Sequence, residues 1–257
     1  MSSLGTSPRP FLSLQKTYGI LTKVQAGSAV VFSTFVVLHG AQIVSANVGG
    51  SGLANNWILL GRPFYQDEHV EGLLVTGSAL THVAAGLAKL GIRLYWNKKA
   101  GQGSHLLPYH AATGYALIPL AGLHYYLVRH LPVDYYGDSS FIDFGYIAWG
   151  LQNKPVFTYG LHLALVVAGV YHSVSGIQVA LGQLKKKKKP SHTKIPQHGK
   201  SVEQQKINEE VSKKHMWKGG LVATVSLACI SGLIIIGRDT KKIPLRLDFA
   251  KIYASIL

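Results

Sequence analysis

The stretch VFTYGLHLALVVAGVYHSVSGIQVALGQL, residues 156–184, decides how this chain folds. It contains no Lys, Arg, Asp or Glu, and it is long enough to cross a bilayer, which takes about 20 apolar residues in a helix. His172 lies near its middle, beside Tyr171 and Ser173. A polar ring in hydrocarbon is costly and is usually kept for binding. The stretch therefore predicts a membrane helix with a functional histidine.

The composition of the whole chain is that of a membrane protein. Of its 257 residues, 47% are hydrophobic and 14% are charged, whereas about a quarter of the residues of soluble domains are charged. A single cysteine, Cys229, excludes an internal disulfide, a CxxC zinc site and covalent haem attachment through CxxCH. No GxGxxG, P-loop or nucleophile–base pattern occurs.

We predict an all-α membrane protein with five transmembrane helices, four of which form a histidine-bearing bundle. Its predicted segments are a polar head (1–23), a four-helix transmembrane bundle (24–184), a polar Lys-rich loop (185–216), a fifth membrane helix (217–237) and an amphipathic tail (238–257). We expect the loop to be mostly disordered and the tail to lie on the membrane surface.

Each helix of the predicted bundle carries one histidine near its middle. The four spans are 24–46, 69–90, 106–131 and 156–184, and they hold, in that order, His39, His82, His124 and His172. A Gly/Asn-rich loop, residues 47–66, is expected to interrupt the helix after the first span. The connection 132–154 is rich in aromatic and acidic residues, which suits a segment at the membrane interface.

The distribution of Lys and Arg predicts the orientation. Most of the 26 Lys and Arg residues fall on the side of the head, including the lysine run 185–189. The positive-inside rule therefore places the head in the cytosol and the tail across the membrane. We interpret the lysine run as a topology signal and a contact with anionic lipid rather than as a nucleic-acid site.

The four central histidines sort into two pairs by depth, at about 1.5 Å per helical residue. His39 and His124 lie toward the far side of the membrane, whereas His82 and His172 lie nearer the cytosolic side. Two b-type haems, each held by two neutral imidazoles, would need ligands at two such levels. Arg129 is placed to pair with a propionate at the far level.

Other arrangements remain open. His110 and His124 are 14 residues apart, within about 40° of one helix face, whereas His162 and His172 face differently, so we prefer one histidine per helix. A histidine in a membrane helix can also simply bond to a neighbouring helix. The remaining histidines are expected to be interfacial or solvated, and they are His69, His105, His110, His130, His162, His192, His198 and His215.

Four short motifs carry a resemblance to a known family. They are VVLHGAQ (36–42), ALTHVAAGL (79–87), AGLHYYLVR (121–129) and GVYHSVSGI (169–177). Over residues 24–237 the chain resembles the fungal MCP family of mitochondrial outer-membrane proteins. Its layout also resembles the membrane-anchor subunits of the two-haem succinate dehydrogenases and fumarate reductases.

The first resemblance implies an adaptor rather than an enzyme. It implies a multi-pass protein of the mitochondrial outer membrane that recruits the bridge-like VPS-thirteen lipid-transfer protein through a cytosolic Pro-x-Pro element, in lipid homeostasis at membrane contact sites. The matching residues are Pro8 and Pro10, flanked by Phe11 and Leu12. The alternative is a transmembrane haem b oxidoreductase with two haems. Transfer of lipid between leaflets by the bundle itself is a third possibility.

Overall fold

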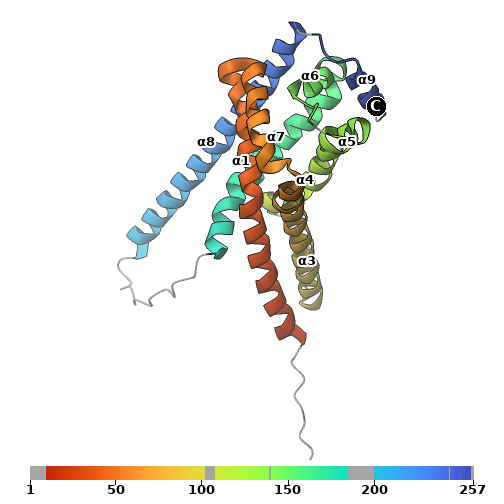
Figure 1. The fold of residues 1–257 in the computed structure, drawn as a ribbon. Helices are drawn as coiled ribbons and strands as arrows, with labels where there is room; N and C mark the ends of the chain where they lie inside the picture. Colours follow the sequence, from red (N-terminus) through yellow and green to blue (C-terminus); the bar gives the residue numbers. More distant parts are fainter. Residues whose placement is uncertain (1–9, 102–107, 139, 185–199, 243, 256–257) are drawn as a thin grey trace, which may run out of the picture. The chain divides into compact units, whose positions relative to one another are not determined.

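The computed structural model describes residues 10–101, 108–138, 140–184, 200–242 and 244–255, and all of its regular elements are helical (Figure 1). The described helices are α1 (Pro10–Tyr65), α2 (Glu68–Val70), η1 (Glu71–Gly77), α3 (Ser78–Lys99), α4 (Tyr109–Tyr125), η2 (Tyr126–His130), α5 (Leu131–Tyr136), α6 (Phe144–Asn153), α7 (Pro155–Leu184), α8 (Lys200–Asp239), η4 (Thr240–Lys242) and α9 (Asp248–Ala254).

The internal contacts of the chain divide it into two compact units. Unit 1 consists of Met1–Val36, Pro63–Pro108 and Ile177–Lys185, whereas unit 2 consists of Val37–Arg62, Tyr109–Gly176 and Lys186–Leu257. Of the four predicted ligand histidines, His82 belongs to unit 1 and the other three belong to unit 2.

Four helical stretches are long and apolar enough to cross a membrane. They are Ser13–Tyr65, Glu71–Lys99, Pro155–Leu184 and Met216–Asp239, and they contain the predicted first, second, fourth and fifth spans almost entirely. The predicted third span, residues 106–131, is not among them. Its described part forms α4, η2 and the first residue of α5, and the 17 residues of α4 are at the lower limit for a membrane helix. The described residues therefore do not confirm the count of five.

Helix α1 extends beyond the predicted first span because the helix is interrupted by only two residues and then resumes. Gly49 (φ −127°, ψ 22°) and Gly50 (φ 64°, ψ −164°) interrupt the helix, and the next residue, Ser51, donates its N–H to Asp239 Oδ2 at 3.0 Å. This contact caps the helix that resumes. The prediction of a loop over residues 47–66 is therefore wrong after the glycine pair.

Two predicted non-helical regions are partly helical. Helix α1 begins at Pro10, inside the predicted head, where proline is tolerated because the first N–H groups of a helix have no partner within it. Pro8 lies outside the described residues. Helix α8 begins at Lys200, so the second half of the predicted disordered loop is helical, and the sequence there places Glu209 and Glu210 four residues before lysines, a spacing that favours a helix.

The core of unit 2 is built around α6. Tyr146 and Ala148 are fully buried, and the Tyr146 hydroxyl donates to Leu127 O at 3.0 Å. Helices α8 and α9 both contact α6, and Figure 1 shows α9 beside it. Aromatic side chains of α6 therefore pack against other helices, and the placement of residues 132–154 at the membrane interface stays a prediction.

The C-terminal tail completes this core. In α9, the side chains of Phe249, Ile252 and Tyr253 are at most 2% exposed. The ring of Tyr253 lies 4.9 Å from that of Tyr146 and 4.9 Å from that of Trp149, centre to centre. The apolar face of α9 therefore packs on protein, and the position of the tail at the membrane surface stays a prediction.

Candidate histidine site

Helices α4 and α7 face each other in unit 2 and carry two histidines each. A Cβ added to Gly176 or to Gly114 would meet His110 or His172, respectively, and one added to Gly169 would meet Leu117. His124 and His162 are also neighbours. As the residue number rises along α4, that of the facing residue on α7 falls by the same amount, which is the register of two antiparallel helices.

His110 and His172 form a stacked pair. Their ring centres are 4.2 Å apart with an interplanar angle of 9°, and His172 Nδ1 donates to His110 O at 3.0 Å. Each ring lies over a glycine of the other helix, because a Cβ on Gly114 would be 2.7 Å from His172 Cε1 and one on Gly176 would be 2.9 Å from His110 Cε1. The glycines therefore make the stacking possible.

A metal ion does not fit between these two stacked rings. With metal–nitrogen bonds of about 2 Å on each side, the centres of two axial imidazoles lie roughly 6 Å apart. The centres of the stacked rings are only 4.2 Å apart. His110 and His172 therefore do not clamp one iron between them.

The second group of rings in unit 2 consists of His39, His124 and His162. The ring centres of His39 and His124 are 6.1 Å apart at 58°, and those of His124 and His162 are 5.2 Å apart at 86°. The separation of His39 and His124 is close to the roughly 6 Å that the centres of two imidazoles holding one iron would have. Among the described residues, no group of three or more His, Cys, Asp or Glu side chains could hold a bare metal ion.

Two nitrogens of this group are buried without a hydrogen-bond partner in the described residues, His124 Nδ1 and His162 Nε2. His162 Nδ1 donates to Thr158 O at 2.7 Å, which fixes the proton on Nδ1 and leaves a lone pair on Nε2 in the neutral ring. A buried polar atom without a partner costs about 1–3 kcal/mol. A ligand that reached these nitrogens would relieve that cost.

The other predicted site residues lie apart from this group. His82 is in α3 and its Nδ1 donates to Gln25 O at 3.1 Å within unit 1, so its pairing with His172 of unit 2 stays a prediction. Arg129 lies half-buried in η2, five residues after His124. Of the predicted partner-binding residues, Pro8 is outside the described part, and Pro10, Phe11 and Leu12 form the start of α1.

The prediction that His110 and His162 are interfacial or solvated is wrong, because both are packed between helices. His69 and His130, by contrast, are exposed. At 3.6 residues per turn, the two histidines of each helix are expected to point in different directions. Helices that coil around each other instead contact along a seam with a period of 3.5 residues. On that seam the steps between contact residues are 3, 4 or 7, as they are from His110 through Gly114 and Leu117 to His124.

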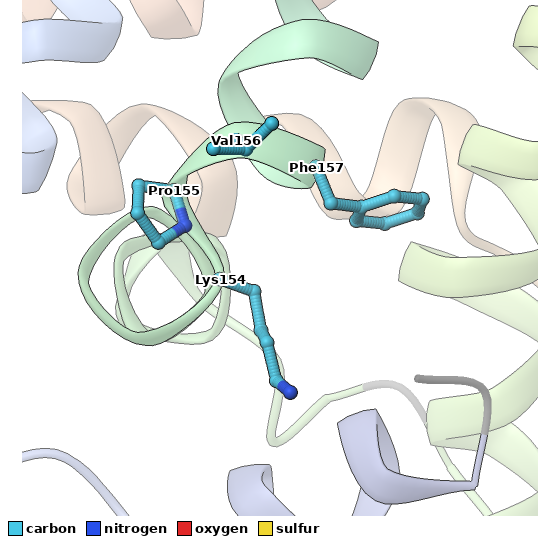
Figure 2. A pocket seen from close by; sticks show the side chains of 4 residues that line it. All are labelled: Lys154, Pro155, Val156 and Phe157. Carbon is cyan, nitrogen blue, oxygen red and sulfur yellow. The ribbon is translucent and has the colours of Figure 1, made fainter.

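A shallow pocket lies at the junction of α6 and α7. It is lined by Lys154, Pro155, Val156 and Phe157, and Figure 2 shows the Lys154 and Phe157 side chains pointing in different directions. Val156 is 89% exposed. Lys154 is the one polar side chain in its lining, so this pocket has fewer groups that could bind a ligand than the clustered histidines have.

A comparison with known families matches the part of the chain that contains His124, His162 and His172. Residues 119–241 match the family model described as MDM10-complementing protein 1, transmembrane domain. No curated protein and no solved structure matches the chain, so the resemblance to the succinate dehydrogenase and fumarate reductase anchors has no support. The chain therefore has four helical stretches that are long and apolar enough to span a membrane, and residues 119–241 are similar to the MCP1 transmembrane domain.

Proposed function

We propose that this protein is an adaptor in the mitochondrial outer membrane that recruits a bridge-like lipid-transfer protein of the VPS-thirteen kind and acts in lipid homeostasis at organelle contacts. The observation that carries the proposal is the match of residues 119–241 to the MCP1 transmembrane domain. The apolar helices supply a multi-pass anchor. The excess of Lys and Arg on the side of the head favours a cytosolic N-terminus.

The position of the Pro-x-Pro element suits recruitment close to the membrane. Prolines restrict the backbone before binding, so a partner that reads Pro8 and Pro10 loses less entropy on ordering them. Pro10 is also the first residue of α1, and the predicted membrane span begins 14 residues later, about 20 Å along a helix. A partner bound to this element would be held near the headgroups.

The test replaces both prolines, Pro8→Ala with Pro10→Ala, in the full-length protein and follows a fluorescent lipid-transfer protein in cells. We expect its recruitment to mitochondria to be lost while the variant itself stays in the outer membrane. The matched control, Pro190→Ala with Pro196→Ala, removes two prolines from the loop on the same predicted side and should leave recruitment unchanged. Full recruitment by the first variant would remove the basis of the adaptor proposal.

The spacing of His39 and His124 favours a second candidate function, transmembrane electron transfer through haem b. In this proposal His39 and His124 would hold the iron of one haem, and Arg129 would pair with a propionate. A bound haem would supply reversible one-electron chemistry. We propose one haem rather than two for unit 2, because His172 is stacked on His110.

An optical spectrum of the detergent-purified protein tests the second candidate. Reduction should give a single, unsplit α band, and His39→Ala or His124→Ala should each abolish the Soret band. His69→Ala is the control, because this histidine is exposed, and it should leave the spectrum intact. A colourless wild-type protein with full helical content would rule out the haem and leave the adaptor proposal untouched.

A further inference from the structure

Unit 1 carries a pair of cations far from all of its acids. Its only acidic residues are Asp67, Glu68 and Glu71, just before and at the start of η1. Lys89 and Arg93 lie 18 and 22 residues after Glu71, about 27 and 33 Å along a helix. No carboxylate of the unit can therefore neutralise these two charges.

The described contacts of Lys89 are with neutral groups. Its Nζ donates to Gln25 Oε1 at 3.0 Å and lies 5.1 Å from the centre of the Tyr18 ring. The amide of Gln25 fits against α3 because Gly86 has no side chain there: a Cβ would lie 2.8 Å from Gln25 Nε2. These contacts fix the position of the ammonium group, and none of those described within unit 1 brings a negative charge to it.

Arg93 follows Lys89 by one helical turn and shares its face of α3. It is half-buried, and its Nε is buried without a hydrogen-bond partner in the described residues. Like charges at this spacing repel each other. An anion that accepts hydrogen bonds from both groups would remove the repulsion and satisfy Nε, and a phosphate matches the forked donors of arginine.

The depth of the pair in the membrane indicates where such a phosphate would come from. The stretch Glu71–Lys99 has 29 residues, about 43 Å of helix, which exceeds the hydrocarbon thickness of about 30 Å. The last turns of α3 therefore extend into the headgroup region. Trp96, whose ring centre is 5.3 Å from that of Tyr18, is the kind of residue found at this level.

We propose that Lys89 and Arg93 form a binding site for the phosphate of an acidic phospholipid in the leaflet at the C-terminal end of α3. The net negative charge of the headgroup balances the two cations, which a zwitterionic lipid does not do. Tyr18 and Trp96 lie beside the site and contact the glycerol region of the same lipid. The inference concerns unit 1 alone and does not depend on the adaptor or the haem.

The test reconstitutes the full-length protein in phosphatidylcholine vesicles that contain photoreactive phosphatidylserine and measures cross-linking to the peptide 86–99. We expect Lys89→Gln and Arg93→Gln each to weaken labelling of this peptide roughly fivefold, the loss that removal of one interfacial charge produces. Arg93→Lys keeps the charge but loses the fork and should fall between wild type and Arg93→Gln. Lys98→Gln is the control, because it removes the same charge from an exposed position on the same helix.

Several outcomes would overturn the proposal. Equal loss of labelling in Lys98→Gln and Arg93→Gln would mean that the lipid responds to general surface charge. Loss of labelling when inorganic phosphate is added at the same concentration as the photoreactive lipid would mean that the site binds a free anion rather than a lipid. If a variant does not fold, the wild-type labelling map decides, since labelling mainly outside the peptide 86–99 contradicts the site and labelling within it supports the site.

Discussion

The imidazoles of His110 and His172 lie parallel, 4.2 Å apart between centres, and each ring occupies the space above a glycine of the other helix. The two histidines therefore act as the contact surface between α4 and α7. Two glycines of α7 can test this contact, because Gly176 faces the His110 ring whereas Gly160 faces open space.

Gly176→Ala should destabilise the contact between α4 and α7. The new Cβ would lie 2.9 Å from His110 Cε1, so the stacked pair must separate, and overpacking of this kind costs about 1–3 kcal/mol. We expect a lower Tm in detergent. In Gly160→Ala, on the same helix, the Cβ meets nothing within 4 Å, so the Tm should stay the same or rise. An equal Tm in both variants would contradict the described packing.

Gly50→Ala should destabilise the bend in α1. Gly50 has φ 64° and ψ −164°, a conformation that costs other residues about 1–3 kcal/mol, and the added Cβ would overlap the Asp239 carboxylate that caps Ser51. We therefore expect a loss of more than about 2 kcal/mol of unfolding free energy in a denaturant titration. Gly52→Ala is the control, because its Cβ meets nothing within 4 Å. Similar unfolding curves for the two variants would contradict the bend.

The bend also illustrates what could be predicted from the sequence. The glycine pair at 49–50 correctly predicts a break in the helix, because glycine tolerates conformations outside the helical region. The return to helix at Ser51 could not be predicted, because it depends on Asp239, 188 residues away along the chain. Local patterns therefore predict where a helix ends better than where the next one begins.

The histidines show a second limit of this kind. The apolar stretches correctly predict helices around His39, His82 and His172, because apolar length is a property of the local sequence. The neighbours of each ring depend on which helices pack together and with what period. His162 lies near the start of the predicted fourth span and His124 near the end of the third, so the lengths of these spans already place both rings toward the same side of the membrane.

Phe249→Ala should destabilise unit 2. The Phe249 side chain is 1% exposed and its ring packs against that of Tyr146 at 5.3 Å, so its removal should cost about 3–5 kcal/mol. The matched control is Leu247→Ala, because Leu247 is 88% exposed and its loss leaves no cavity. We expect increased protease cleavage around α6 only in the first variant. A membrane-bound tail would instead make the loss of Leu247 at least as costly.

Stability at acidic pH should depend on Asp248. Burial raises the pKa of this carboxyl, but hydrogen bonds from Arg246, 2.8 Å away, and from Tyr136, together with the charge of Arg246, outweigh that effect and hold the pKa below its usual value. A carboxyl with a lowered pKa contributes stability at neutral pH that is lost as the pH falls through the folded pKa, here below about pH 4. Asp248→Asn should therefore lower the Tm at pH 7, and the difference should shrink as the pH falls below about 4. A constant difference between the two proteins across this range would refute the role of the charge.

Two substitutions at His162 can reveal whether its buried Nε2 has a ligand. His162→Asn keeps a donor near the position of Nδ1, which bonds to Thr158 O at 2.7 Å, and removes Nε2. His162→Gln keeps a polar nitrogen near the position of Nε2 and loses the Nδ1 donor. Because the only hydrogen bond described for this side chain is that of Nδ1, the Asn variant should be more stable by about 0.5–1.5 kcal/mol. The opposite order, measured by thermal unfolding of the purified protein, would mean that Nε2 is bonded to a bound group in the native protein.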